Sequence, residues 1–112
     1  MPLLNTYGSV TLDAKGYGQV ILNPTAMMDW TITRIAVKTT QGTTDTPVPT
    51  CTVYLGSVSD GDIVDQTWTG SRDVSDCNFV VPYGTPLIFE WVGGIAGTTA
   101  TASVIGTQAL RS

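Results

Sequence analysis

The sequence contains no histidine and few charged residues, which make up 12% of its 112 residues. The commonest general base and metal ligand of enzymes is therefore missing. Neither Cys51 nor Cys77 has a histidine to activate its thiol as a nucleophile. The single glutamate, Glu90, lies in an apolar run and fits a carboxylate on a partly wet strand face, paired with Arg34, better than a catalytic acid. We therefore predict that the protein is not an enzyme and uses no cofactor.

Basic residues are also scarce. There are five, scattered along the chain, and the formal net charge is −4. Nucleic-acid binding requires clustered lysine and arginine, so it is not expected. No apolar run approaches the roughly 18 residues of a membrane-spanning helix, and residues 1–5 lack the basic region and apolar core of a secretory signal. We expect a soluble protein made in the cytoplasm, with no membrane partner.

The cysteines leave two alternatives. A disulfide between Cys51 and Cys77 would close a loop and contribute roughly 3 kcal/mol in the chain-entropy picture. A reducing compartment disfavours such a bond. Two free thiols are the favoured interpretation.

Threonine and glycine are abundant, with nineteen and twelve copies. Threonine is stiff at its first side-chain torsion and fits a pleated, half-exposed surface, which favours an all-β protein. The most definite strand is residues 87–92, an apolar run between turn-forming residues, with Leu87, Phe89 and Trp91 on one face. Because both of its faces are largely apolar, we predict that it is the central strand of a sheet.

Other short strands are expected around it. Residues 9–13 and 19–22 read as a β-hairpin, and residues 51–55, 63–69, 77–81 and 99–105 alternate as strands. Turn signals recur at the roughly 8–12-residue spacing of sandwiches and barrels. We predict one all-β domain over residues 1–112, an antiparallel β-sandwich of jelly-roll-like type with about eight short strands. Residues 1–7 form a possible N-terminal arm.

The longest strand signal, over residues 27–39, contains a change of phase. Trp30 and Ile32 share one face, whereas Ile35 and Val37 are displaced from that pattern by one residue. A β-bulge near residues 33–34 would return all four side chains to the core.

Clustered aspartates raise the question of a calcium site. Asp60, Asp62 and Asp65 lie close together, and Asp73 and Asp76 follow across the next loop. Carboxylate oxygens at such spacing can hold Ca²⁺. However, the twelve-residue calcium loop with its terminal glutamate is absent, and Asp-Gly is a common turn pair. Solvated turns are the favoured interpretation, and no metal site is predicted.

Aromatic residues offer a second binding hypothesis. Trp68 lies among polar residues, and together with Tyr54 and Tyr83 it could stack against a sugar if these rings are exposed. Trp30 and Trp91 lie in strongly apolar runs. Core packing is the favoured role for the aromatic residues as a group.

The chain carries a series of strand and turn stretches that are spread over most of its length: VTLD at 10–13 followed by Gly16, Gly18 and Val20, WTITRIAV at 30–37, PVPTCTVYL at 47–55, DQTWTG at 65–70 followed by Asp73, and WVGGIAG at 91–97. Together these stretches resemble small β-sandwich virion proteins encoded by tailed phages of actinobacteria. Such proteins serve as capsid decoration proteins or as minor tail proteins, and no catalytic residues accompany them.

The resemblance implies a structural protein of a virion, assembled in the host cytoplasm. The favoured function is a capsid decoration or cement protein that binds major capsid protein subunits on the outer capsid. A homo-oligomer, with a trimer as the natural form at three-fold positions, is expected. The expected interface residues lie in the N-terminal arm and the 41–49 loop: Leu3, Leu4, Tyr7, Thr43, Asp45, Pro47 and Pro49. The alternatives are a minor tail or tail-tip protein and a carbohydrate-binding attachment module that uses Tyr54 and Trp68.

Overall fold

A computed structural model describes residues 3–25, 27–41, 46–66 and 72–110. These residues form eight strands and one short 3-10 helix, η1 (Asp60–Asp62). The strands are β1 (Leu3–Thr11), β2 (Gly18–Leu22), β3 (Met28–Thr39), β4 (Thr50–Leu55), β5 (Ile63–Gln66), β6 (Arg72–Val81), β7 (Leu87–Val92) and β8 (Thr99–Leu110).

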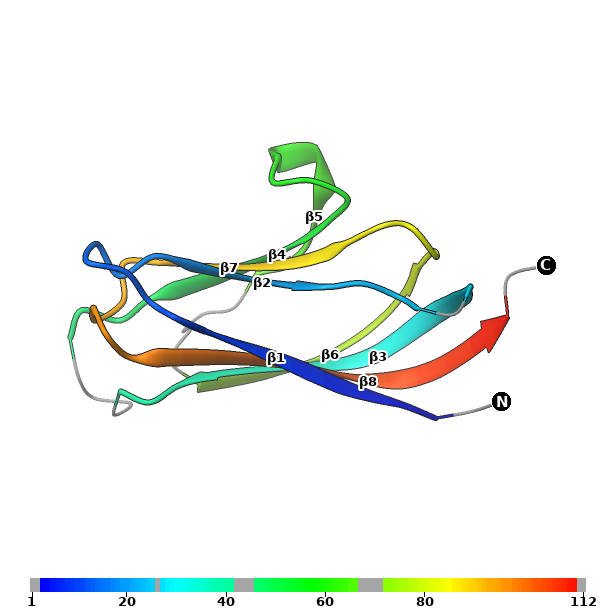
Figure 1. Cartoon of the computed structure of the whole chain (residues 1–112), viewed down its shortest axis with the longest axis horizontal. Helices are drawn as coiled ribbons and strands as arrows, with labels where there is room; N and C mark the ends of the chain where they lie inside the picture. The colour runs from blue at the N-terminus through cyan, green and yellow to red at the C-terminus, as the bar shows by residue number, and fades with distance from the viewer. Residues whose placement is uncertain (1–2, 26, 42–45, 67–71, 111–112) are drawn as a thin grey trace.

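The strands form two four-stranded antiparallel sheets that pack face to face (Figure 1). The first sheet has the order β1-β8-β3-β6 and the second the order β2-β7-β4-β5. The pairs β1–β8, β2–β7, β3–β6 and β4–β5 are nested, as in one long antiparallel ribbon folded over on itself. This nesting is the topology of a jelly roll. The predicted antiparallel β-sandwich is confirmed.

The predicted hairpin of residues 9–13 and 19–22 is wrong. β1 pairs with β8 in the first sheet, whereas β2 pairs with β7 in the second, so the turn between them crosses from one sheet to the other. The two strands meet through their side-chain faces: a Cβ on Gly8 would lie 2.8 Å from Cγ1 of Val20. Glycine at this position allows the two sheets to approach closely at their shared flank.

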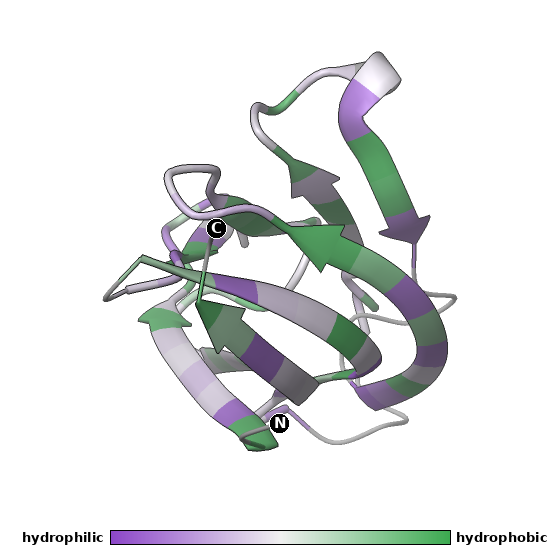
Figure 2. Cartoon of the chain, turned by 90° about the vertical axis from the view of Figure 1, so that its right-hand side faces the viewer, coloured by the Kyte–Doolittle hydropathy of each residue, from purple (hydrophilic) through white to green (hydrophobic). Residues whose placement is uncertain are grey.

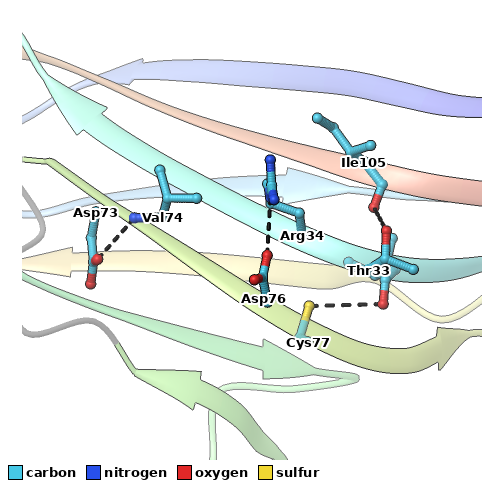
Figure 3. A network of polar contacts seen from close by, with 8 residues as sticks. Thr33, Arg34, Asp73, Val74, Asp76, Cys77 and Ile105 are labelled. Atoms are coloured by element: carbon cyan, nitrogen blue, oxygen red, sulfur yellow. Dashed lines mark hydrogen bonds and ion pairs between the residues drawn. The ribbon is translucent and has the colours of Figure 1, made fainter.

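The predicted bulge is confirmed. The register of β3 shifts between Ile32 and Arg34 against both of its neighbours. Trp30, Ile32, Ile35 and Val37 consequently all face the core, with exposed fractions of 5% or less. The side chain of Thr33 points outward at the bulge, and its hydroxyl donates to the carbonyl of Ile105 at 3.2 Å (Figure 3).

The predicted central strand also lies where expected. β7 is an interior strand between β2 and β4, and Leu87, Phe89 and Trp91 are fully buried. The rings of Phe89 and Trp91 stack with centroids 6.5 Å apart. The other strands alternate between hydrophilic and hydrophobic residues (Figure 2), and their hydrophobic residues complete the core between the sheets.

Three strands are longer than the sequence predicts. Residues 3–7 belong to β1, so the expected arm is an edge strand over this range. β6 begins at Arg72 within the expected 70–76 loop, and β8 continues to Leu110. Polar residues take inward positions in the added segments, Thr6 in β1 and Asp73 and Ser75 in β6, so the apolar alternation of a strand is weak there.

Candidate interaction surface

The outer face of the first sheet, meaning the side turned away from the second sheet, exposes several large apolar side chains. They come from all strands of this sheet except β3: Leu3 (83% exposed), Tyr7 (71%), Val74 (61%), Val80 (51%) and Ile105 (44%). Single exposed apolar residues are ordinary, but several on one sheet face point to an interaction site.

The register places these residues in rows across the sheet. Tyr7 lies opposite Ser103, Ser103 opposite Ala36, and Ala36 opposite Val74. One row therefore runs from β1 to β6, with an exposed apolar side chain at each edge. The side chains of Ala36 and Ser103 between them are small, so the surface of the sheet is recessed in the middle of the row.

A shallow hollow of about 620 Å³ lies over these two small residues. Its lining includes Ala36, Ser103, the two cations Lys38 and Arg72, and one carboxylate, Asp73. Lys38 and Arg72 are directly opposite each other on β3 and β6, an arrangement that is destabilising for like charges. Neither cation takes part in an ion pair with another residue that the structure describes. Their positions suit an acidic group on a partner.

Beyond the hollow, Arg34 and Asp76 form an ion pair on the same face, with Nε 3.0 Å from Oδ1 (Figure 3). The expected pairing of Arg34 with Glu90 is therefore wrong. The two residues lie in different sheets, Arg34 in β3 and Glu90 in β7. Because both side chains of the observed pair are more than half exposed, solvent screens it and its contribution to stability is small.

Glu90 is instead bound within the second sheet. Its Oε2 accepts a hydrogen bond from the Tyr17 hydroxyl at 3.0 Å and one from Nε2 of Gln19 at 3.4 Å. Partial burial, followed by the hydrogen bond to Glu90 and the negative charge of that carboxylate, raises the pKa of Tyr17. Glu90 thus holds the side chains of Tyr17 and Gln19 in place on the outer side of the β2–β7 pair.

Of the predicted interface residues, Leu3 and Tyr7 are exposed on β1, and Pro47 is exposed in the loop before β4. Leu4 and Pro49 are buried, so their side chains are unavailable to a partner. For Leu4 the cause is strand alternation, which turns every second residue of β1 toward the core. Thr43 and Asp45 lie outside the described residues.

The loop is anchored from its buried side. Gln41 is 7% exposed; its Nε2 donates to the carbonyl of Pro47 at 3.0 Å, and its Oε1 accepts from the backbone N–H of Ile95 at 3.4 Å. This side chain ties the loop to the turn between β7 and β8.

Among the aromatic residues proposed for sugar stacking, Tyr54 is only 8% exposed and offers little ring surface. Tyr83 is 42% exposed in the turn between β6 and β7. Trp68 lies outside the described residues.

Four of the five clustered aspartates serve local turns and pairs, and the side chain of Asp60 lies outside the described part of the structure. Oδ2 of Asp62 accepts hydrogen bonds from the hydroxyls of Ser57 and Ser59, and Asp76 pairs with Arg34. One carboxylate oxygen each of Asp65 and Asp73 accepts from the backbone N–H of the following residue. Within the described ranges, no three potential ligands are grouped so as to hold a metal ion.

Both cysteines are free thiols in separate sheets, Cys51 on β4 and Cys77 on β6. Burial raises the pKa of the Cys51 thiol far above its ordinary value, and nearby carboxylates add to the effect. Burial also raises the pKa of Cys77, whose Sγ lies 3.8 Å from the carbonyl of Ile32 (Figure 3). Neither environment activates a nucleophile.

The sequence did not indicate the residues around the hollow. Lys38, Val74 and Arg72 come from two strands and meet only through the register of β3 and β6. The alternation in residues 34–38 could indicate that Lys38 points outward, but not that Arg72 lies beside it.

No helix among the described residues is long and apolar enough to cross a membrane. Comparison of the chain with protein-family models, with curated proteins and with solved structures gave no match.

Proposed function

We propose that this chain is a structural protein of a phage particle, a capsid decoration protein that binds major capsid protein subunits on the outer capsid. The virion assignment rests on the resemblance of its strand and turn stretches to small virion proteins. The observation that supports an association role is the outer face of the first sheet, with its exposed apolar side chains and with Lys38 and Arg72 at its hollow.

This surface suits a protein partner. Apolar side chains of the outer face provide area whose removal from water favours association. Lys38 and Arg72 add attraction for acidic groups and thereby fix orientation. Jelly rolls occur both in viral capsid proteins and in lectins, so the fold alone does not choose between a virion role and sugar binding. The burial of Tyr54 makes the sugar-binding alternative less favourable.

The location of the protein on purified particles of the phage that encodes it tests this proposal. Mass spectrometry of the particles establishes whether the protein is present, and immunogold labelling in the electron microscope places it on the head or the tail. We expect a signal from the particles and gold on the head. Gold confined to the tail would overturn decoration in favour of a tail protein, and absence from the particles would overturn the virion assignment.

A variant links the location to the proposed surface. Lys38→Glu combined with Arg72→Glu reverses the charge of the hollow without touching the core, and we expect it to bind particles that lack the wild-type protein at least tenfold more weakly. Lys15→Glu is the matched control, because Lys15 is an exposed cation in the turn after β1, away from this face. Equal binding by the double variant and the control would exclude the hollow from the contact.

A further inference from the structure

β1 is an edge strand without the usual protection against pairing with another chain. Among the residues that the structure describes it pairs only with β8, and its other edge is open along the flank that faces the viewer in Figure 1. Its nine residues, LLNTYGSVT, include no charge and no proline, and its register with β8 runs without a bulge. Soluble proteins usually guard a long edge strand with one of these devices.

The three other edge strands are guarded. β2 and β5 are short, with five and four residues. β6 has ten residues, one more than β1, but carries Arg72, Asp73 and Asp76. Only β1 combines length with an uncharged sequence.

The direction of the free backbone groups follows from the hydrogen bonds at the end of β1. The N–H of Leu12 donates to the carbonyl of Thr98 on the β8 side at 2.9 Å, so even-numbered residues turn their backbone groups toward β8. Odd-numbered residues then turn their N–H and C=O groups to the open edge: Leu3, Asn5, Tyr7, Ser9 and Thr11. The side chains of all five are exposed. Of these groups, the carbonyl of Leu3 already accepts a hydrogen bond from Gln108.

We propose that β1 pairs with β1 of a second copy of this chain, antiparallel about a two-fold axis. The first sheets of the two copies then form one continuous eight-stranded sheet. The register that uses the whole strand is centred on Tyr7, the middle residue of Leu3–Thr11. It places Tyr7 opposite Tyr7 of the second copy, and Asn5 opposite Ser9.

The strand that pairs with the open edge of β1 is β1 of a second copy, because this edge is complementary to itself. Each molecule carries a net charge of −4, so two copies repel through most contacts, and an uncharged strand is where they can meet at least cost. A two-fold contact requires that the same surface fit itself. In the register centred on Tyr7, the backbone N–H and C=O groups of the odd-numbered residues of one strand face those of the other. The exposed rings of the two Tyr7 residues become cross-strand neighbours. The pairing does not depend on the virion assignment.

The mass of the purified full-length protein in solution tests the proposal. Sedimentation equilibrium over a concentration series that reaches the submillimolar range is expected to give a dimer of twice 11.8 kDa. A monomer throughout the series, or a trimer, would overturn the two-fold pairing.

Two variants direct the test to the open edge. Tyr7→Lys places like charges opposite each other at the axis, and Ser9→Pro removes an N–H that the monomer does not use. We expect each to weaken dimerisation at least tenfold while circular dichroism shows an intact fold. Val74→Lys is the matched control, because Val74 ends the same row on the opposite edge of the sheet, and it is expected to dimerise like the wild type. A dimer unaffected by either β1 variant, or lost in Val74→Lys, would contradict the proposal.

A cysteine placed at the axis tests the register. In a background with Cys77→Ser, Tyr7→Cys is expected to form an intermolecular disulfide on mild oxidation, because opposite residues of a hydrogen-bonded pair have Cα atoms about 5.5 Å apart. Asn5→Cys in the same background faces Ser9 of the second copy and is expected to remain largely unlinked. Efficient linkage through residue 5 and not through residue 7 would overturn this register.

Discussion

The side chain of Asp13 holds together the turn that carries the chain from the first sheet to the second. Its Oδ1 accepts hydrogen bonds from the backbone N–H groups of Lys15 and Tyr17, at 2.9 and 3.0 Å. A carboxylate accepts such bonds better than a carboxylic acid does. The two bonds, that from Tyr17 first, therefore lower the pKa of Asp13 below its ordinary 3.8.

The lowered pKa predicts how stability depends on pH. Between the folded and unfolded pKa values, the unfolded chain binds more protons, so the contribution of Asp13 is present above pH 3.8 and is lost as the pH falls through the folded value. Asp13→Asn keeps the accepting oxygen and removes the titration. We expect urea unfolding of this variant to show a smaller loss of stability below pH 3.8 than the wild type. Parallel acid profiles would contradict this role.

At the scale of the strands, β8 lies close against the bulge of β3. Gly106 on β8 lies against it, and a Cβ there would come within 1.9 Å of the carbonyl oxygen of Thr31. Backbone atoms on both sides leave no flexible group to yield. The glycine therefore lets β8 pass the irregular part of β3 without losing its pairing.

Gly106→Ala is accordingly expected to destabilise the fold by about 1–3 kcal/mol or more, since the sheet must open to admit the methyl group. Gly61→Ala is the matched control, because nothing lies within 4 Å of its added Cβ. The free energies of unfolding in urea provide the comparison. Equal stability of the two variants would mean that the bulge relaxes at no cost.

At this scale the sequence predicted the elements better than their partners. Period-two alternation identified the core faces of β3 and β7, and the change of phase near Thr33 predicted the bulge correctly. The pairing of β1 could not be predicted, because the turn at Asp13–Gly16 has the same residues whether it joins two strands of one sheet or crosses between sheets. The hollow depends on the register of Lys38 against Arg72, which no local pattern encodes. Leu3 and Tyr7 were predicted together with Leu4 because residues 1–7 are mildly apolar, and strand alternation then separates the exposed pair from the buried Leu4.

In the molecule as a whole, the last strand occupies an interior position. β8 lies between β1 and β3 and pairs with both along most of its length. Ala100, Ala102 and Val104 of β8 are fully buried. The first sheet is therefore divided in two without it.

A chain that ends at Thr98 is expected to lack cooperative unfolding, because β1 loses its only partner strand and β3 loses one of two. Far-ultraviolet circular dichroism during a urea titration would detect this loss. A chain that ends at Leu110 retains all of β8 and is the control, with an expected transition like that of the full chain. A sharp transition in the shorter variant would show that the remaining strands form a stable domain.

The interior position of β8 also has a consequence for synthesis. Leu3 pairs with Thr107, so β1 is synthesised long before the strand with which it pairs. Translation adds about 5–20 residues per second, which keeps the apolar faces of β1 and β3 open to water, and to chaperones, for seconds. Pairing between residues so far apart in the chain also slows folding itself. The first sheet therefore cannot form completely until β8 has been synthesised.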